Sequence, residues 1–202
     1  MSPIDKLTEY FSLFPGIGMR QARRFVYFLL RSDAQVSQEI ASLIQKIKEE
    51  TAQCSSCYRF FEPKDSLPQC NTCLDPVADE KLLLIVEKDQ DLDAIRKSGM
   101  FNGKYFVLGG LIPIGAGKRP KHLKDKELFM KISKETHIQE VVLALSAHPE
   151  GDVTSTYIKE QLFPIGKKRP LRVTTLGRGI STGTELEYSD TDTIAHALGN
   201  RK

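Results

Sequence analysis

No apolar run in this 202-residue chain approaches the roughly 20 residues of a transmembrane helix, which excludes a helical membrane span. The first 14 residues contain Asp5 and Glu9 and lack the basic-then-apolar order of a secretory signal peptide. Internal repeats and low-complexity stretches are absent as well. With 40% hydrophobic and 27% charged residues the composition is that of an ordinary globular protein, and we expect a cytoplasmic protein of one or two compact domains.

Acidic residues are missing from residues 12–32, although the net charge of the whole chain is only +3. That window contains Arg20, Arg23, Arg24 and Arg31. Two further basic clusters follow, with Lys118, Arg119, Lys121, Lys124 and Lys126 in the first and Lys167, Lys168 and Arg169 in the second. Such clusters are either solvated loop charges or contacts to phosphate groups, and charge alone favours solvated loops.

Cysteine is scarce, and all four cysteines lie within one 20-residue window. Their spacing is C-x2-C, twelve residues, C-x2-C, formed by Cys54, Cys57, Cys70 and Cys73. Each C-x2-C turn directs two thiolates toward one point, and two such turns complete a tetrahedral zinc shell. Because this shell leaves no position for water, the sequence predicts one structural Zn²⁺ per chain. The alternatives are a redox-active pair or two disulfides, and disulfides are disfavoured in a cytosolic chain.

The first 52 residues have a helical pattern. Apolar residues recur at helical spacing in three stretches, within residues 7–14, 22–30 and 40–47. The turn 15–18 follows the first stretch, and a break at 32–37 separates the second from the third. The pattern predicts a small helical bundle. Residues 53–77 lose this periodicity and contain few apolar residues, so we expect metal binding to supply much of their folding free energy.

From Lys81 onward, short apolar runs alternate with helical patterns. The runs cover residues 82–87, 105–109, 141–145 and 172–176, and the helical patterns cover 91–98, 126–136, 154–162 and 193–198. This alternation is typical of a parallel sheet with helices on its faces. The sequence therefore predicts an α/β protein with a helical N-terminal part, a small four-cysteine region, a parallel sheet and a short polar tail.

The turn Pro15-Gly16-Ile17-Gly18 joins two of the helical stretches. Glycines allow a tight hairpin in which backbone N–H groups can approach a ligand closely. The helix that starts there presents free N–H groups and a positive dipole end, with Arg20, Arg23 and Arg24 in its first two turns. We interpret Gly16, Gly18 and these three arginines as a helix-hairpin-helix that contacts phosphates without reading bases. The alternative is an ordinary corner between two helices.

Acidic residues follow two of the apolar runs. Glu87 ends the first run, and Glu150-Gly151-Asp152 follows the third. Because parallel strands end at the same edge of a sheet, these carboxylates could converge and hold Mg²⁺. Glycine between Glu150 and Asp152 would let both point the same way from a tight turn. It is equally compatible with the sequence that each acid caps a helix or faces water.

The order of these features resembles the bacterial RecR family of recombination mediator proteins. A helix-hairpin-helix precedes four zinc-binding cysteines and a Toprim-like sheet, and residues 178–188, RGISTGTELEY, resemble the family's C-terminal motif. That motif continues through Asp190, Thr193 and Leu198. The resemblance implies a helix-hairpin-helix DNA-binding domain at 1–52, a four-cysteine zinc finger at 53–77, a Toprim domain at 80–176 and an oligomerisation segment at 177–202.

The resemblance also implies a function without catalysis. RecR proteins assemble into rings, usually tetramers, that are large enough to encircle DNA. They act with RecO and RecF to help RecA displace single-strand binding protein from gapped DNA. For this chain the resemblance implies binding of double- and single-stranded DNA without base specificity, association with the bacterial nucleoid, and a homo-oligomer, either a tetramer or a dimer. It further implies that Glu87, Glu150 and Asp152 contact a partner and that the tail takes part in subunit exchange.

Several positions depart from the family pattern. Met19 stands where proline is usual, Ile112 replaces serine, Ser146 replaces asparagine and Ser181 replaces proline. Arg20 keeps the positive charge that lysine usually supplies, and Arg24 occupies the usual arginine position. The DNA-binding hairpin therefore stays intact, and the details of the Toprim surface are the part of the family pattern most affected.

A Toprim enzyme is the competing hypothesis. A nuclease or primase-like enzyme would use Glu87, Glu150 and Asp152 with Mg²⁺. A topoisomerase would also need a tyrosine on a separate cleavage domain, for which the assigned segments leave no room. A zinc-containing scaffold without a DNA role is a third hypothesis. We favour a clamp because one hairpin makes few phosphate contacts, whereas a ring presents several hairpins at once.

Overall fold

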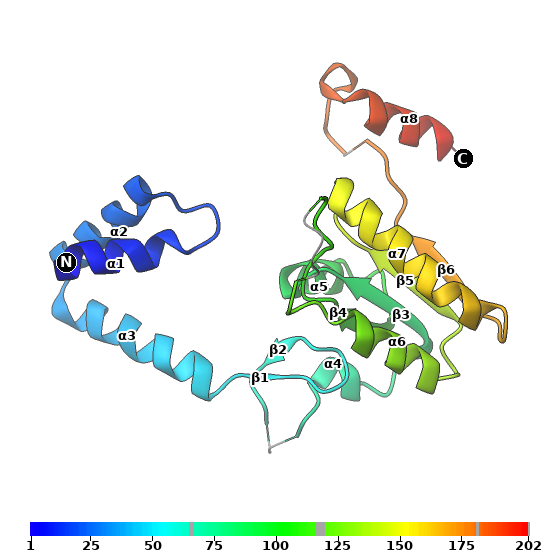
Figure 1. Cartoon of the computed structure of the whole chain (residues 1–202), viewed down its shortest axis with the longest axis horizontal. Coiled ribbons are helices and arrows are strands. Elements are labelled where there is room, and N and C mark those ends of the chain that lie inside the picture. Colours follow the sequence, from blue (N-terminus) through cyan, green and yellow to red (C-terminus); the bar gives the residue numbers. More distant parts are fainter. Residues whose placement is uncertain (65–66, 116–119, 181, 202) are drawn as a thin grey trace. The chain divides into compact units, whose positions relative to one another are not determined.

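The computed structural model describes residues 1–64, 67–115, 120–180 and 182–201. The chain divides into two compact units, Met1–Thr51 and Ala52–Lys202, which we call the helical unit and the α/β unit (Figure 1). Within the described ranges, no helix combines the length and the apolar content that crossing a bilayer requires.

The helical unit begins with two packed helices, α1 (Pro3–Ser12) and α2 (Met19–Arg31). Ser2 caps α1 by accepting a hydrogen bond from the backbone N–H of Asp5, and Pro3 starts the helix with a suitable φ angle. Small and branched residues bring the two helices together. Thr8, Ala22 and Val26 are buried, and the rings of Phe11 and Phe25 meet edge to face at 6.0 Å.

The third helix, α3 (Ala34–Glu49), exists as predicted but buries none of its residues. Val36, Ile40, Leu43, Ile44 and Ile47 are all exposed. The predicted three-helix bundle is therefore wrong for a single chain, because only α1 and α2 pack closely. The break before α3 is also shorter than predicted. It covers only Ser32 and Asp33, since Ala34 and Gln35 favour helix and join the first turn.

The α/β unit begins with the small cysteine-containing segment. An antiparallel pair of two-residue strands, β1 (Ala52–Gln53) and β2 (Phe60–Phe61), flanks the first C-x2-C turn. The second turn leads into a single helical turn, α4 (Asn71–Leu74). The absence of regular periodicity in this part of the sequence thus reflects short elements arranged around the cysteines.

A four-stranded parallel sheet forms the centre of this unit, as predicted from the four apolar runs. Its strands are β3 (Asp79–Val86), β4 (Gly103–Val107), β5 (Glu140–Ala144) and β6 (Arg172–Thr175). They lie in the order β4-β3-β5-β6, and every neighbouring pair is parallel. The register places Val86 beside Ala144, so β3 and β5 end together and their following loops share one edge of the sheet.

Helices cover both faces of the sheet (Figure 1). Side chains that point to one face, such as Leu83, Ile85 and Phe106, pack with residues of α6 (Asp125–Lys134) and α7 (Pro149–Gly166). Their neighbours Leu84 and Val86 point to the other face, toward α5 (Asp89–Ser98). This alternation is the two-residue period of a strand that is buried on both sides.

Helix α7 begins five residues before the predicted start at Thr154 because Pro149 occupies its first turn, where proline is well tolerated. The tail after β6 contains a short 3-10 turn, η1 (Leu186–Tyr188), and α8 (Thr191–Gly199). Asp190 caps α8 by accepting a hydrogen bond from the backbone N–H of Thr193.

Candidate functional site

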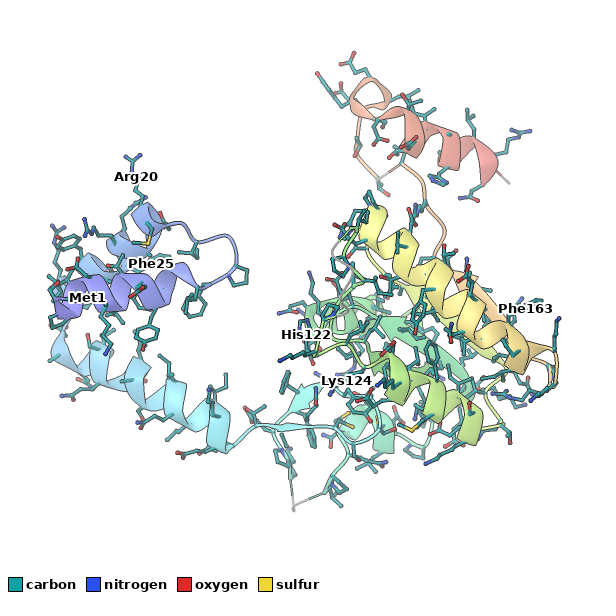
Figure 2. All side chains as sticks on the ribbon, viewed as in Figure 1. Met1, Arg20, Phe25, His122, Lys124 and Phe163 are labelled. Atoms are coloured by element: carbon teal, nitrogen blue, oxygen red, sulfur yellow. The ribbon has the colours of Figure 1, made fainter. Side chains whose placement is uncertain are left out.

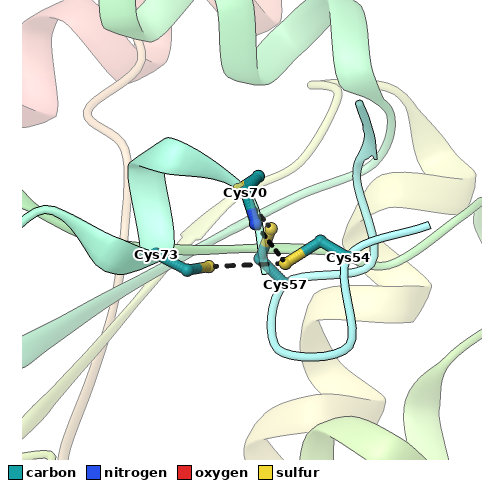
Figure 3. A group of neighbouring side chains, drawn as sticks. All are labelled: Cys54, Cys57, Cys70 and Cys73. Atoms are coloured by element: carbon teal, nitrogen blue, oxygen red, sulfur yellow. Dashed lines mark hydrogen bonds between the residues drawn. The ribbon is translucent and has the colours of Figure 1, made fainter. Parts of the chain in front are cut away.

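The four cysteines converge as their spacing predicts. Figure 3 shows their sulfur atoms directed toward one another. Sγ of Cys54 lies 3.7 Å from Sγ of Cys73, and Sγ of Cys57 lies 3.6 Å from Sγ of Cys70. All four are free thiols, and a disulfide would require sulfur atoms about 2.0 Å apart. The cluster could therefore hold a metal ion, with one sulfur ligand from each residue.

Local backbone geometry prepares these sulfurs for coordination. The N–H of Tyr58 donates to the carbonyl of Cys54, and the N–H of Cys73 donates to the carbonyl of Cys70, which closes each C-x2-C turn. The N–H of Cys70 points at Sγ of Cys54 at 3.3 Å. This N–H group favours the thiolate of Cys54, which is the form that binds metals.

The cysteine cluster is fastened to the edge of the sheet. The carbonyl of Cys57 accepts a hydrogen bond from the N–H of Val107, at 2.8 Å, so the first turn covers the outer side of β4. The ring of Tyr58 packs 5.2 Å from the ring of Phe106 in the core. Tyr58 adopts a φ of 62°, which is strained for a residue with a bulky side chain. The ring contact with Phe106 in the core stabilises this conformation.

Charged residues make a second set of connections between the cluster and the sheet. The ammonium of Lys104 in β4 donates to the carbonyls of Cys73 and Asp75. The guanidinium of Arg59 lies 3.3 Å from the carboxylate of Asp93 in α5 and is largely buried. Sequence reasoning did not identify these anchors, because nothing in the local pattern shows which lysine or arginine faces the cysteines.

The hairpin between α1 and α2 places its two glycines where the chain turns and where α2 begins. Gly16 has a φ of 77°, which glycine adopts without strain, and Gly18 is the N-cap of α2. No side chain caps α2, and its first turn contains no acid. Its first N–H groups therefore remain available to an anion.

Two of the three predicted arginines have no acidic partner among the described residues. Arg20 makes no hydrogen bond or ion pair within that part of the chain, and it extends from α2 into solvent (Figure 2). Arg24 contacts only Gln21 of its own helix, at 3.2 Å. Arg23 differs, because its guanidinium lies 3.2 Å from the carboxylate of Asp5 in α1. The acid-free window 12–32 therefore suggests more unpaired positive charge than the fold leaves, because Asp5, 18 positions before Arg23, pairs with that arginine.

Several residues of the other two basic clusters make contacts within the protein. Arg169 donates to the carbonyls of Ile132, Thr136 and Ile138 and so caps the end of α6. Lys124 lies over the ring of Tyr58 and pairs with Glu127 at 3.7 Å. Lys118, Arg119 and Ser181 lie outside the described residues. The described members of these clusters therefore favour solvated or structural charges over a dedicated phosphate site.

The three acids at the carboxyl edge of the sheet each have a different partner. Glu87 accepts a hydrogen bond from the hydroxyl of Ser146, at 2.6 Å. Glu150 lies 3.1 Å from the imidazole of His148. Asp152 forms an ion pair with Arg178. Within the described ranges, the cysteine cluster is the one group of three or more candidate ligands close enough to share a metal ion.

Gly151 has a different role from the one predicted. Residues 150–152 lie in the first turn of α7 and do not form a separate tight turn. A Cβ atom at Gly151 would come within 1.9 Å of the carbonyl oxygen of Ser146. Glycine is required here because α7 starts in close contact with the loop that leaves β5.

Asp152 pairs with Arg178, a residue of the tail motif that the sequence does not identify as a site residue. The guanidinium of Arg178 donates through both terminal nitrogens to the two oxygens of the Asp152 carboxylate. This fork, assisted by His196 and His148, holds the pKa of Asp152 below its usual value. The sequence does contain one signal for this contact. Arg178 stands between Gly177 and Gly179, and flanking glycines are typical of a charged residue held on a conformationally free segment.

Comparisons with known proteins agree with this architecture. The family model described as Toprim domain matches residues 81–176, and the model described as RecR, C-terminal matches residues 179–202. A recombination protein RecR from Herpetosiphon aurantiacus is 34% identical over 200 residues, covering 99% of this chain and 94% of that protein. Proteins of the same name from Chloroherpeton thalassium and Syntrophotalea carbinolica are each 35% identical, covering 98% of this chain and 95% of their own length. The chain therefore belongs to the RecR family, and its parallel sheet is that of a Toprim domain.

Proposed function

We propose that this chain is a non-enzymatic, DNA-binding recombination mediator that forms a ring-like clamp in recombinational DNA repair. It acts with RecO and RecF to promote RecA loading on gapped or single-stranded DNA, in the cytoplasm and near the nucleoid. The relatives at about 34% identity carry the name recombination protein RecR, which supports a role in repair.

The observation that carries the DNA contact is the uncapped N-terminus of α2 beside Arg20 and Arg24. Backbone N–H groups and a helix dipole favour a phosphate at this position, and two arginines beside it add charge. The donors at this position are backbone N–H groups and guanidinium groups, which suit phosphate oxygens. This supports binding to the DNA backbone without sequence preference.

We assign the metal at the cysteine cluster as zinc with a structural role. Four thiolates around zinc at about 2.3 Å form a tetrahedron with edges of about 3.8 Å. The two sulfur–sulfur distances of 3.7 and 3.6 Å agree with that edge length. Cys54, Cys57, Cys70 and Cys73 would supply all four ligands, so bound zinc would hold the cluster against β4 and leave no position for water.

The exposed face of α3 supports a homo-oligomer, either a dimer or a tetramer. Its apolar residues Leu43, Ile44 and Ile47 are more than half exposed. A second copy would remove this apolar surface from water and would bring a second hairpin to the same DNA. Light scattering at several protein concentrations tests this proposal. Leu43→Asp/Ile47→Asp should lower the mass and weaken DNA binding with every arginine intact, whereas the control Lys48→Asp should leave the mass unchanged.

The engaged acids support a function without catalysis. Glu87, Glu150 and Asp152 are each held by a side chain of this protein, and metal-assisted phosphoryl chemistry needs carboxylates that share a metal ion. An assay with supercoiled plasmid and millimolar Mg²⁺ should therefore detect no nicking. Cleavage that disappears in Glu87→Gln would overturn this part of the proposal in favour of a Toprim nuclease.

The DNA contact is tested by replacing Arg20 and Arg24, the two arginines beside the hairpin that have no acidic partner among the described residues. Arg20→Ala/Arg24→Ala should weaken binding to double- and single-stranded DNA alike. Each lost phosphate contact lowers the slope of log K against log salt by about 0.9 on duplex DNA, so the slope should fall by about 2 per engaged hairpin. Arg31→Ala removes one positive charge at the opposite end of α2 and is the control for each of the single variants Arg20→Ala and Arg24→Ala. Equal retention by the double variant and the control would contradict the hairpin assignment.

A further inference from the structure

The acidic edge of a Toprim sheet is where the fold leads one to expect Mg²⁺, but the residues of this chain do not fit that ion. Magnesium requires near-octahedral oxygen ligands at about 2.0–2.1 Å. Glu87, Glu150 and Asp152 do not form a group with ligand atoms close enough to share one ion. Each carboxylate instead has a hydrogen-bond or ion-pair partner from this chain. No chemical step is therefore assigned to magnesium at this edge.

A guanidinium group takes both oxygens of Asp152. Nη1 of Arg178 lies 3.2 Å from Oδ2 of Asp152, and Nη2 contacts Oδ1. Two parallel N–H···O contacts of this kind combine charge with a fixed geometry, which an ammonium group cannot reproduce. The side chain of Arg178 is only 33% exposed, so the contact is partly protected from solvent.

The tail contributes to the same arrangement. The amide of Asn200, directly after α8, donates to the backbone carbonyl of Arg178 at 2.8 Å. A cleft of about 540 Å³ lies between the ends of β5 and β6, the start of α7 and the tail, and Asp152, Arg178 and His196 line it. Arg178 falls between the segments matched by the Toprim model and by the RecR C-terminal model. It is therefore placed to connect the two.

We propose that the acidic edge of this Toprim domain is a guanidinium-binding site in place of a magnesium site, with Arg178 as its resident cation. The fork to Asp152 docks the tail on the edge of the sheet. A ligand that needs the Asp152 carboxylate must displace Arg178, and α8 loosens when it does. This inference does not depend on the DNA-binding proposal, since it concerns contacts within the α/β unit alone.

Hydrogen–deuterium exchange of the α8 amides in the full-length, zinc-loaded protein tests the docking. Asp152→Asn and Arg178→Gln should each speed exchange by roughly threefold to fivefold, the range expected for a partly exposed ion pair. The double variant should exchange no faster than either single variant, because both substitutions break the same contact. Glu160→Gln removes an exposed carboxylate further along α7, away from the acidic edge, and is the control that should leave α8 unchanged.

Manganese supplies the complementary readout, because free Mn²⁺ is measured directly by electron paramagnetic resonance. At millimolar Mn²⁺ the wild-type protein and Asp152→Asn should bind the same amount of the ion. Mn²⁺ binding by the wild type that Asp152→Asn abolishes would overturn the proposal. It would also be overturned if the single variants left α8 exchange unchanged, or if their effects multiplied in the double variant. DNA retention does not enter either readout, so failure here is distinct from failure of the clamp proposal.

Discussion

The α/β unit and the helical unit differ in how completely they bury their own apolar side chains. The α/β unit has a core cluster on each face of its sheet, with residues such as Phe106 and Leu84 almost entirely buried. The helical unit buries only Thr8, Ala22 and Val26, and its helix α3 buries nothing. One unit thus has the core of a finished domain, and the other has apolar surface that its own residues do not cover.

This difference suggests a division of labour within the proposed clamp. Burial of apolar surface stabilises a fold by about 25 cal/mol per Å², so the α/β unit has its own source of stability once its metal is bound. The helical unit displays its hairpin arginines and the apolar face of α3 on the same small structure. We expect its stability to depend on assembly more than that of the α/β unit does.

Removal of the metal should have the largest effect on stability, and it should destabilise the α/β unit much more than the helical unit. Structural zinc contributes roughly 10 kcal/mol or more of binding free energy, comparable to the whole stability of a typical domain. Chelation, or Cys57→Ser, should therefore unfold the α/β unit, because the metal would fix the turn whose backbone carbonyl, at Cys57, accepts the hydrogen bond from Val107 of β4. Metal analysis should give one zinc per wild-type chain, and hydrogen exchange should rise across β3, β4 and β5.

The same experiment tests whether the two units differ in their dependence on the metal. Exchange in α1 and α2 should change little, since their mutual contacts do not involve the cysteines. If both units lost protection together, their stabilities would be linked. If the protein contained no zinc and stayed folded in chelator, the structural role of the cluster would be wrong.

Truncation of one buried ring should have the next largest effect. Phe106→Ala removes a fully buried side chain beneath Tyr58 and should lower the free energy of unfolding by about 3–5 kcal/mol. Phe28→Ala in α2 removes a ring that is 63% exposed and should cost less than about 1 kcal/mol under conditions where the protein is monomeric. Urea unfolding followed by circular dichroism measures both. Equal losses would show that Phe28 is covered in solution.

The sequence predicted the elements better than it predicted their contacts. The four strands and their parallel direction follow from the alternation of apolar runs with helical patterns, and the cysteine cluster follows from spacing. Arg23–Asp5 and Arg178–Asp152 could not be predicted, because their partners lie 18 and 26 positions apart and no local pattern pairs them. The exposed face of α3 shows the same limit. Helical periodicity identifies an apolar face but does not specify which chain covers it.

Replacing one glycine in each unit by alanine compares how closely the backbone is packed in the two units. Gly151→Ala places a Cβ 1.9 Å from the Ser146 carbonyl, so α7 must shift, at a cost of about 1–3 kcal/mol. Gly18→Ala meets no atom within 4 Å and should cost less than about 1 kcal/mol. Thermal unfolding at fixed zinc and protein concentration tests both. A larger loss of stability at Gly18 would show that the hairpin packs in solution against atoms outside its own chain.

Acidification should have the smallest effect, and it compares one ion pair from each unit. Arg178 depresses the pKa of Asp152, and Ser2 together with Arg23 depresses that of Asp5. A carboxyl group with a depressed pKa stabilises the fold above its ordinary pKa of 3.8, and that stability is lost as pH falls through the lower folded value. His148 and His196 also face Asp152, and a positive charge on either imidazole favours the carboxylate form.

Because Asp152 is 54% exposed, solvent screening limits its contribution to about 1 kcal/mol or less. We therefore expect the exchange of α8 amides, corrected for the intrinsic effect of pH, to stay constant from about pH 7 to about pH 5. It should rise only below about pH 4, where carboxylates take up protons. In Asp152→Asn this rise should be smaller, because the carboxylate of the fork is gone and only the N-cap of α8, Asp190, still takes up a proton. A rise near pH 6 in the wild type would instead assign control of the tail to a histidine, and the guanidinium fork would not be what holds α8.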